Sequence, residues 1–438
     1  ENFSKDLKNQ TPRVRLKRKT MRTTTFRFYF SSSLVISSTH IPRRALPLLR
    51  CLSSATDKQQ QGTTGKPNLK SREIAIRRDK EKRRTRSEKN FNIEESPSFL
   101  PDDHVPVLLG EVLDVFTSIS IKTFVDCTLG AGGHSSAIIK SHGEMQNYLG
   151  IDVDPLAHEK AKERLQISSK DNPRLNIRTE QKNFKQVKSL LDEMKLNRGA
   201  DGILMDLGMS SMQIDVSGRG FSMMADAPLD MRMDPQGSLK AKDILNTWPE
   251  EELGRVLRDY GEEFNWRVLQ RKILEERLYG GLHYTTELVD LIQSASRKPS
   301  GGRHGWIKTA IRIFQALRIT VNDELNTLEN SLHDCFECLA PGGRLAVISF
   351  HSLEDRIVKR TFLEMIHGAE SEKEENDDRK ERYDDEEMKE SWIKQIVKGS
   401  YGTILTRRPV TPSVYEEKVN RRSRSAKLRV IQKSSSCF

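Results

Sequence analysis

The chain has 438 residues, of which 35% are hydrophobic and 31% are charged, and its formal net charge is +11. This length suits two or three domains at about 150 residues each, and five cysteines are too few for a disulfide framework in so long a chain. No apolar run reaches the roughly 18 residues that a membrane-spanning helix needs. We therefore expect a soluble body with no membrane partner.

The N-terminal segment carries the positive charge. Residues 1–90 hold 24 Lys and Arg against 7 Asp and Glu, whereas the rest of the chain holds 49 against 55. From Met21 to about Ala55 the sequence is rich in Arg, Ser and Thr and has no acid, which is typical of a mitochondrial or plastid transit peptide. We predict that residues 1–97 are a transit peptide and a disordered basic linker, with import into the mitochondrial matrix or chloroplast stroma. The alternative is a basic tail that binds nucleic acid.

A glycine-rich turn follows the first strand of the body. The β-prone residues Phe124–Cys127 precede the glycines of Gly130–Gly133, and a helix-like run follows at 135–141. This order is how α/β folds bring backbone close to a nucleotide, because glycine permits the tight turn and leaves room for the ligand. Asp152 ends the next strand, 22 positions after Gly130, near the roughly 20 expected for a carboxylate that binds a ribose. We predict an adenosine-containing ligand.

The rest of the body alternates strands and helices, which predicts a doubly wound, mostly parallel sheet. Further strands are expected at 148–152, 175–179, 202–207 and 344–350, with a helix at 155–166. The sheet domain is expected in two parts, 98–216 and 306–438, the second containing an acidic disordered loop at 370–390 with 12 acids and 5 basic residues.

A helical insertion separates the two parts. Residues 217–305 show helical periodicity, clearest at 240–260 and 266–278, and no convincing strand. We expect this subdomain to form one wall of a cleft above the strand ends. A helix beginning at Arg312–Arg318 then returns to the sheet. The C-x-x-C pair Cys335 and Cys338 is interpreted as half-buried helix positions, because a metal or redox site would want a second pair or a turn; no metal is expected.

Four polar blocks are placed to carry chemistry. Asp206 leaves the fourth strand, and ligands of such sheets lie beyond the strand carboxyl ends. The turn-like stretch 228–234 and the preceding Arg219 combine acids with arginines, either facing the cleft or forming a satisfied salt-bridge loop. His351 lies where the fifth strand ends and a helix begins, either structural or facing substrate. The basic run 421–429 is either an RNA contact or an exposed tail.

These blocks together resemble the MraW/RsmH family of S-adenosylmethionine-dependent methyltransferases. The resemblance covers most of residues 104–430 and is carried by 130–135, 206–215, 219–234, 314–325, 349–360 and 420–429. It implies a Rossmann-like class I methyltransferase fold with an inserted helical subdomain. It also implies methyl transfer to the exocyclic N4 amine of a cytidine in the decoding region of small-subunit ribosomal RNA. The family occurs in bacteria and in organelles of bacterial descent, which agrees with the predicted transit peptide.

The resemblance also implies site residues. It places the glycines at the turn, Asp152 on the ribose, Phe184 near the adenine, and Asp206 and Gln213 beside the methionine part. The implied cofactor-binding residues are Gly130, Gly132, Gly133, His134, Asp152, Phe184, Asp206 and Gln213. Met212 departs from the family, which usually has proline there.

The group that orients the cytosine amine is left open. Many amino-group methyltransferases carry an Asp/Asn-Pro-Pro-aromatic motif after the fourth strand, but here that place reads Asp206-Leu207-Gly208-Met209. The candidate catalytic residues are Asp206, Asp234 and His351. The expected contacts to RNA phosphates are Arg232, Arg303, Arg312, Arg421 and Arg422.

Two other functions share parts of this pattern. An NAD-dependent oxidoreductase would also use the glycine turn and Asp152. That function would not explain the blocks at 206–234 and 349–360. A ribosome-assembly factor could keep the fold and lose catalysis. The expected partner in either methyltransferase or assembly role is the small ribosomal subunit or its RNA, and a homodimer is possible.

Overall fold

The computed structural model describes residues 85–87, 89, 105–170, 172–196, 198–215, 217–296, 305–367, 392–393 and 395–435, all within one compact unit. The predicted transit peptide lies outside the described residues, as do almost all of the linker, Arg303 and the acidic loop 370–390. None of the helices in the described ranges is long and apolar enough to cross a membrane.

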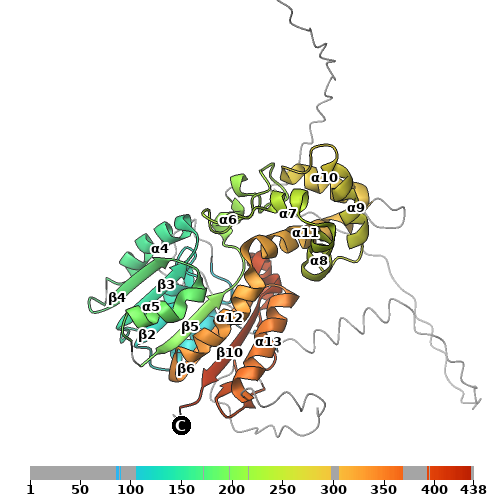
Figure 1. Ribbon diagram of the computed structural model, residues 1–438. Coiled ribbons are helices and arrows are strands. Elements are labelled where there is room, and N and C mark those ends of the chain that lie inside the picture. Colours follow the sequence, from blue (N-terminus) through green and yellow to red (C-terminus); the bar gives the residue numbers. More distant parts are fainter. Residues whose placement is uncertain are drawn as a thin grey trace, which may run out of the picture. The chain divides into compact units, whose positions relative to one another are not determined.

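A mostly parallel sheet forms the centre of the fold (Figure 1). Its strand order is β1-β9-β10-β6-β5-β2-β3-β4, and β6, β5, β2, β3 and β4 run parallel to one another while β10 runs antiparallel to β6. The strands are β1 (Thr85–Arg86), β2 (Thr123–Asp126), β3 (Asn147–Asp152), β4 (Asn176–Gln181), β5 (Ala200–Asp206), β6 (Leu339–Ser349), β7 (Val397–Lys398), β8 (Gly402–Ile404), β9 (Val410–Thr411) and β10 (Lys427–Lys433). The doubly wound, mostly parallel sheet predicted from the sequence is confirmed.

Helices cover both faces of this sheet because alternate strand residues point to opposite sides. Phe124 and Tyr148 pack with α2, α3 and α4, whereas Val125 and Leu149 pack with α5, α12 and α13. These helices are α2 (Leu109–Thr117), α3 (Gly133–Ser141), α4 (Pro155–Ser168), α5 (Val187–Glu193), α12 (Glu324–Glu337) and α13 (Ser352–His367). Cys335 is fully buried in α12 rather than half-buried.

The helical insertion has a hydrophobic core of its own. Its helices are η3 (Ser217–Arg219), α7 (Ala241–Thr247), α8 (Glu250–Arg255), the π-helical turn η4 (Val256–Tyr260), α9 (Trp266–Arg277) and α10 (Thr285–Ala295). The short helix α6 (Ser211–Asp215) precedes the insertion, and α11 (Gly305–Asn322) leads back to the sheet (Figure 1). The expectation of one helix over 240–260 was wrong, because Pro249 lacks an N–H and separates α7 from α8. Arg312 lies inside α11 rather than at its start.

The C-terminal basic run is folded, so the alternative of an exposed tail was wrong. It follows α14 (Val414–Val419) and comprises the 3-10 turn η5 (Arg421–Ser425) and β10. On β10, Lys427 donates to Asp355 at 2.6 Å and Arg429 donates to the same carboxylate at 2.8 Å. These two bonds fasten β10 to α13.

Candidate active site

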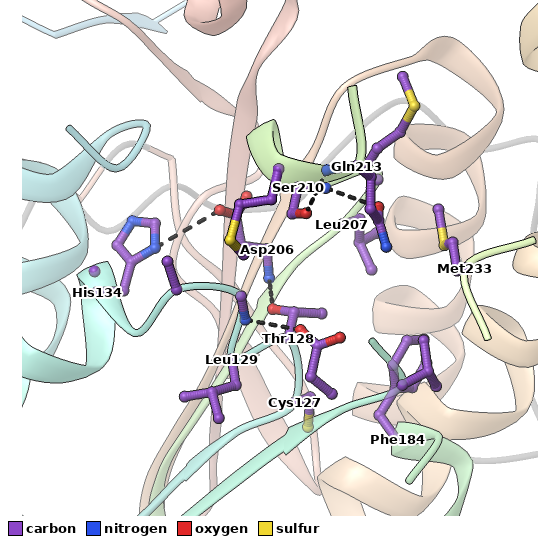
Figure 2. A pocket seen from close by; sticks show the side chains of 18 of the residues that line it. Cys127, Thr128, Leu129, His134, Phe184, Asp206, Leu207, Ser210, Gln213 and Met233 are labelled. Carbon is purple, nitrogen blue, oxygen red and sulfur yellow. Dashed lines mark hydrogen bonds and ion pairs between the residues drawn. The ribbon is translucent and has the colours of Figure 1, made fainter. Parts of the chain in front are cut away.

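The carboxyl ends of the central strands open into a cavity of about 850 Å³ (Figure 2), within the range of roughly 300–1,000 Å³ typical of small-molecule sites. It extends from the glycine turn to the segment 232–237 of the insertion. Among the predicted cofactor-binding residues, those that line it are Gly130, Gly133, His134, Asp152, Phe184, Asp206 and Gln213. Gly132 lies behind the turn, where an added Cβ would meet Ala161 of α4 at 3.4 Å.

Buried polar side chains hold the glycine turn in place. Gly130 and Gly132 adopt left-handed backbone, with φ of 51° and 74°, which glycine accepts at little cost. Asp126 accepts hydrogen bonds from Thr128 N at 3.0 Å and from Ser135 Oγ. Burial raises the pKa of Asp126 to about 6, although these bonds oppose the rise. The turn is therefore built around a carboxyl rather than around apolar packing alone.

Asp152 contacts the same turn from the next strand. Its two oxygens accept hydrogen bonds from Gly130 N at 2.7 Å and Asp154 N at 2.8 Å. Burial raises the pKa of Asp152 above its ordinary value. Because each carboxylate oxygen has a second lone pair, Asp152 can still accept bonds from ribose hydroxyls.

Asp206 faces the cavity without a cation to balance it within the described residues. Its Oδ1 is buried and has no hydrogen-bond partner, and its Oδ2 lies 3.6 Å from His134 Nδ1. His134 Nε2 is 3.0 Å from the carbonyl of Val107, which can only accept, so we assign the ring proton to Nε2. Burial lowers the pKa of His134 to about 4, and Nδ1 of the neutral ring has no proton for Asp206.

The electrostatics around Asp206 favour a cationic ligand. Burial raises its pKa well above the ordinary value, and the neighbouring charges of Asp126 and Glu354 raise it further. A positively charged group in the cavity would balance the charge of the ionised Asp206 side chain, which lines it. S-adenosylmethionine carries a sulfonium and an ammonium group, so the donor set fits this cofactor.

A buried ion pair ties the insertion to the cofactor side. Asp154 caps α4 and accepts bonds from Gln213 Nε2 at 3.1 Å and from Arg219. Arg219 also donates to the carbonyls of Arg232 and Met233 at 2.9 and 2.8 Å. Sequence reasoning missed Asp154 as a site residue and left Arg219 between a position facing the cleft and a salt bridge, and the structure shows the salt bridge.

The same loop is held from its other side by α11. Asn322 accepts a hydrogen bond from Met233 N at 2.7 Å and donates to the carbonyl of Met231 at 2.9 Å. Met231 has left-handed backbone with φ of 61°, so these bonds stabilise a conformation that is unfavourable for its side chain. Asn322 was also missed, although it lies inside a block of the resemblance.

The remaining predicted residues divide between the cavity and the surface. Asp234 and Arg232 line the cavity. The Arg232 guanidinium already binds Asp230 at 2.7 and 2.8 Å and two backbone carbonyls, so this stretch forms the salt-bridge loop that was one of its two interpretations. Arg422 also lines the cavity. Arg312 and Arg421 are exposed and do not line it.

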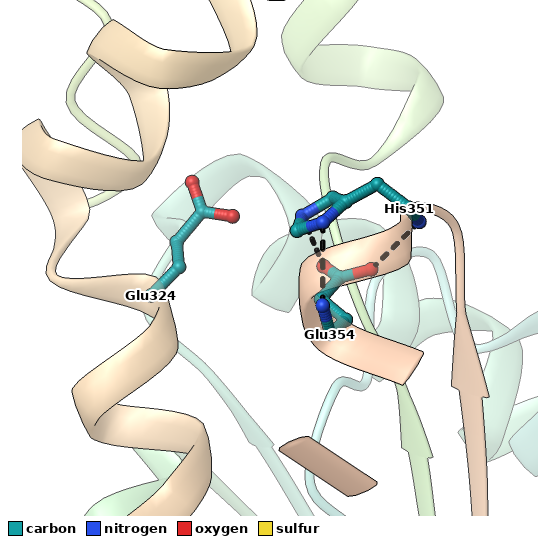
Figure 3. A group of neighbouring side chains, drawn as sticks. All are labelled: Glu324, His351 and Glu354. Atoms are coloured by element: carbon teal, nitrogen blue, oxygen red, sulfur yellow. Dashed lines mark hydrogen bonds and ion pairs between the residues drawn. The ribbon is translucent and has the colours of Figure 1, made fainter. Parts of the chain in front are cut away.

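His351 itself does not line the cavity, but it belongs to a second polar cluster with Glu324 and Glu354, which do (Figure 3). Its Nε2 lies 3.1 Å from Glu354 Oε1, and Glu354 Oε2 accepts from Phe350 N at 2.8 Å. Burial opposes ionisation of Glu354, but His351 and Arg318 outweigh it and hold the pKa below its ordinary value. With Glu324 the three are spaced to hold a metal ion, yet Arg318 already occupies both Glu324 oxygens at 2.9 Å.

Comparisons with known proteins identify the family of the chain. A family model described as the MraW methylase family matches residues 102–434. The ribosomal RNA small subunit methyltransferase H of Heliobacterium mobile is 42% identical over 330 residues, which cover 75% of this chain and 98% of that protein. The protein of the same name from Protochlamydia amoebophila is 44% identical over 331 residues, which cover 75% of this chain and 97% of that protein. A solved rRNA methylase from Streptococcus thermophilus aligns at 9% identity over 76% of this chain and 99% of that one, and its TM-score of 0.32 adds nothing to the fold assignment.

Proposed function

The chain belongs to the MraW methylase family of S-adenosylmethionine-dependent ribosomal RNA methyltransferases, and from this premise we propose that it methylates the exocyclic N4 amine of a cytidine in organellar small-subunit ribosomal RNA. The observation that carries the proposal is the uncompensated carboxylate of Asp206 in the cavity at the strand ends. The charged segment 1–97 supports the organellar part of the proposal.

The chain's own residues would do three things in this reaction. Gly130, Asp152 and Phe184 would hold the adenosine part of S-adenosylmethionine, which supplies an electrophilic methyl group when bound. Asp206 would offset the positive charge beside that methyl group. The loop 231–234, fixed by Arg219 and Asn322, would close the site and exclude water.

The cytosine amine needs orientation more than it needs a base. Its lone pair is delocalised into the ring, so an acceptor for the N–H groups must turn the nitrogen toward the methyl carbon. Asp206, Asp234 and His351 are the candidate acceptors, and the surplus proton can pass to water after transfer. Alignment at near-attack distance supplies much of the remaining rate.

The proposal is tested by loss of the modification. The gene is deleted, small-subunit RNA is isolated from mitochondria and, where present, plastids, and N4-methylcytidine is measured by mass spectrometry. We expect the modification to disappear from one organelle and to return with the wild-type gene. Unchanged N4-methylcytidine in both organelles would refute the proposal. Full rescue of ribosome function by Asp206→Ala, without the modification, would instead favour the assembly-factor role.

A further inference from the structure

A strained segment of the insertion follows helix α8. The helix widens into the π-helical turn η4, closed by a hydrogen bond from Gly261 N to Val256 O at 3.1 Å. A Cβ at Gly261 would lie 2.5 Å from Leu257 O, so only glycine fits. Glu262 then adopts left-handed backbone with φ of 45°. Single π turns and strained non-glycine residues gather at functional sites, which makes this segment a candidate for a role beyond packing.

The strained segment is fastened beside the second polar cluster of the active site. Glu262 accepts a hydrogen bond from Ser352 Oγ at 2.8 Å and lies 3.4 Å from Arg356. Ser352 begins α13 directly after His351. The neighbouring Glu263 is buried and lies 3.4 Å from Arg312. The segment therefore has a fixed position beside the start of α13, next to the polar cluster of Glu324, His351 and Glu354.

This anchoring leaves Phe264 exposed. Its side chain is 92% exposed, the most among the large hydrophobic residues of the described ranges. Trp266 lies two positions on and is half-buried, with the guanidinium carbons of Arg258 and Arg267 at 5.6 and 4.5 Å from its ring centroid. A lone exposed ring carries little weight, but aromatic faces among arginines are the chemistry that binds single-stranded nucleic acid.

The two acids that precede Phe264 lie beside cations, Glu262 at 3.4 Å from Arg356 and Glu263 at 3.4 Å from Arg312. The arginines of α9 near Phe264 remain available to a polyanion. Arg267 and Arg271 are exposed on α9 and, being four positions apart, lie on the same face of the helix. Neither forms an ion pair with an acid in the part of the chain that the structure describes. Both can therefore contact phosphates without first breaking an internal salt bridge.

We propose that Phe264, Trp266, Arg267 and Arg271 form a docking site outside the cavity for an unpaired stretch of the substrate RNA. A base stacks on the Phe264 ring, and the two arginines contact the flanking phosphates. The inference rests on the proposed function and adds to it a second RNA contact, on the insertion rather than at the C-terminal arginines.

The test compares Phe264→Ala with Phe264→Tyr and with the matched control Tyr279→Ala, since Tyr279 is also 86% exposed on the insertion. Binding is measured to small-subunit ribosomal RNA transcribed in vitro and to purified small subunits, with S-adenosylmethionine binding as the check on folding. We expect F264A to bind RNA about 5- to 150-fold more weakly, the effect of losing one stacked base. F264Y and Y279A should bind as the wild type does, and cofactor affinity should stay unchanged in all three.

Salt dependence tests the arginines separately. The double variant Arg267→Ala/Arg271→Ala should lower the slope of log affinity against log salt by about 1.4, from two lost contacts to single-stranded phosphates. Equal RNA binding by F264A and Y279A would overturn the inference. So would weakened binding of F264A to assembled subunits but not to RNA, because that result assigns the surface to a ribosomal protein. Failure of the wild type to methylate the RNA would overturn the proposed function itself.

Discussion

Replacing Asp206 by asparagine should stabilise the ligand-free protein and weaken its binding of S-adenosylmethionine. Asparagine keeps the shape of the side chain and removes its charge. The pKa of Asp206 is raised by burial and by the charges of Asp126 and Glu354, so the folded protein holds this proton more tightly than the unfolded chain does. Ionisation therefore costs folding free energy at any pH above the unfolded value of about 4. Asp206→Asn removes that cost, and the gain grows as pH rises through the folded pKa.

Both effects have expected magnitudes. Removal of the charge should raise the free energy of unfolding by about 0.5–2 kcal/mol, the usual gain from a single stabilising substitution. A hydrogen bond to a charged group is worth about 1.5–3 kcal/mol, so its loss should weaken S-adenosylmethionine binding about 10- to 150-fold. The two changes have opposite signs, which a general disturbance of the fold would not produce.

Thermal unfolding without ligand and calorimetric titration with S-adenosylmethionine measure the two effects. Asp355→Asn is the matched control, because Asp355 is paired with Lys427 and Arg429 and these partners, working against burial, hold its pKa below the ordinary value. That variant should lose stability and keep its cofactor affinity. A ligand-free D206N protein less stable than the wild type, or one that binds the cofactor equally well, would refute the reasoning.

Three further outcomes are expected. The affinity of the wild type for S-adenosylmethionine should rise with pH as Asp206 ionises, with proton release on binding. Titrations of D206N should show a smaller rise, left by Asp152 and Asp126, whose pKa values are also raised by burial. Arg219→Lys keeps the charge that faces Asp154 but loses the bonds to the carbonyls of residues 232 and 233. The loop 231–234 should lose about 1–3 kcal/mol of local stability, so limited proteolysis should cleave it faster than in the wild type. An unchanged cleavage rate would contradict the role of Arg219 in anchoring this loop. In Gly133→Ala a Cβ would lie 2.6 Å from Pro106 Cγ. Chemical denaturation should therefore show a free energy of unfolding lower by about 1–3 kcal/mol. An unchanged free energy of unfolding would mean that Pro106 can move away without cost.

Features set by neighbouring residues could be predicted from the sequence. The glycine turn follows from glycines at Gly130 and Gly132 after a β-prone run, because their left-handed backbone is a local requirement. Asp206 could be placed at the cavity because ligands of parallel sheets lie beyond the strand ends. The start of α8 after Pro249 has an equally local cause, because proline and the acids of residues 250–252 favour the first turn of a helix.

Other features could not be predicted, either because they join distant segments or because the local sequence is compatible with more than one structure. Asp154 has the pattern of an ordinary helix N-cap, and its bond to Arg219 spans 65 positions. Arg232 has the sequence context of either an RNA contact or an ion pair, and only the fold shows that Asp230 and two carbonyls occupy its donors. The π turn before Gly261 is likewise hidden, because a single widened turn hardly changes the helical periodicity of the sequence.

Reconstitution tests the central claim most directly. The purified chain is incubated with S-adenosylmethionine that carries a deuterated methyl group and with organellar small subunits from the deletion strain, and the RNA is digested to nucleosides for mass spectrometry. We predict labelled N4-methylcytidine, present with the wild-type protein and lost or strongly reduced with Asp206→Asn. Label in another nucleoside, or no label with a protein that binds the cofactor, would contradict the account.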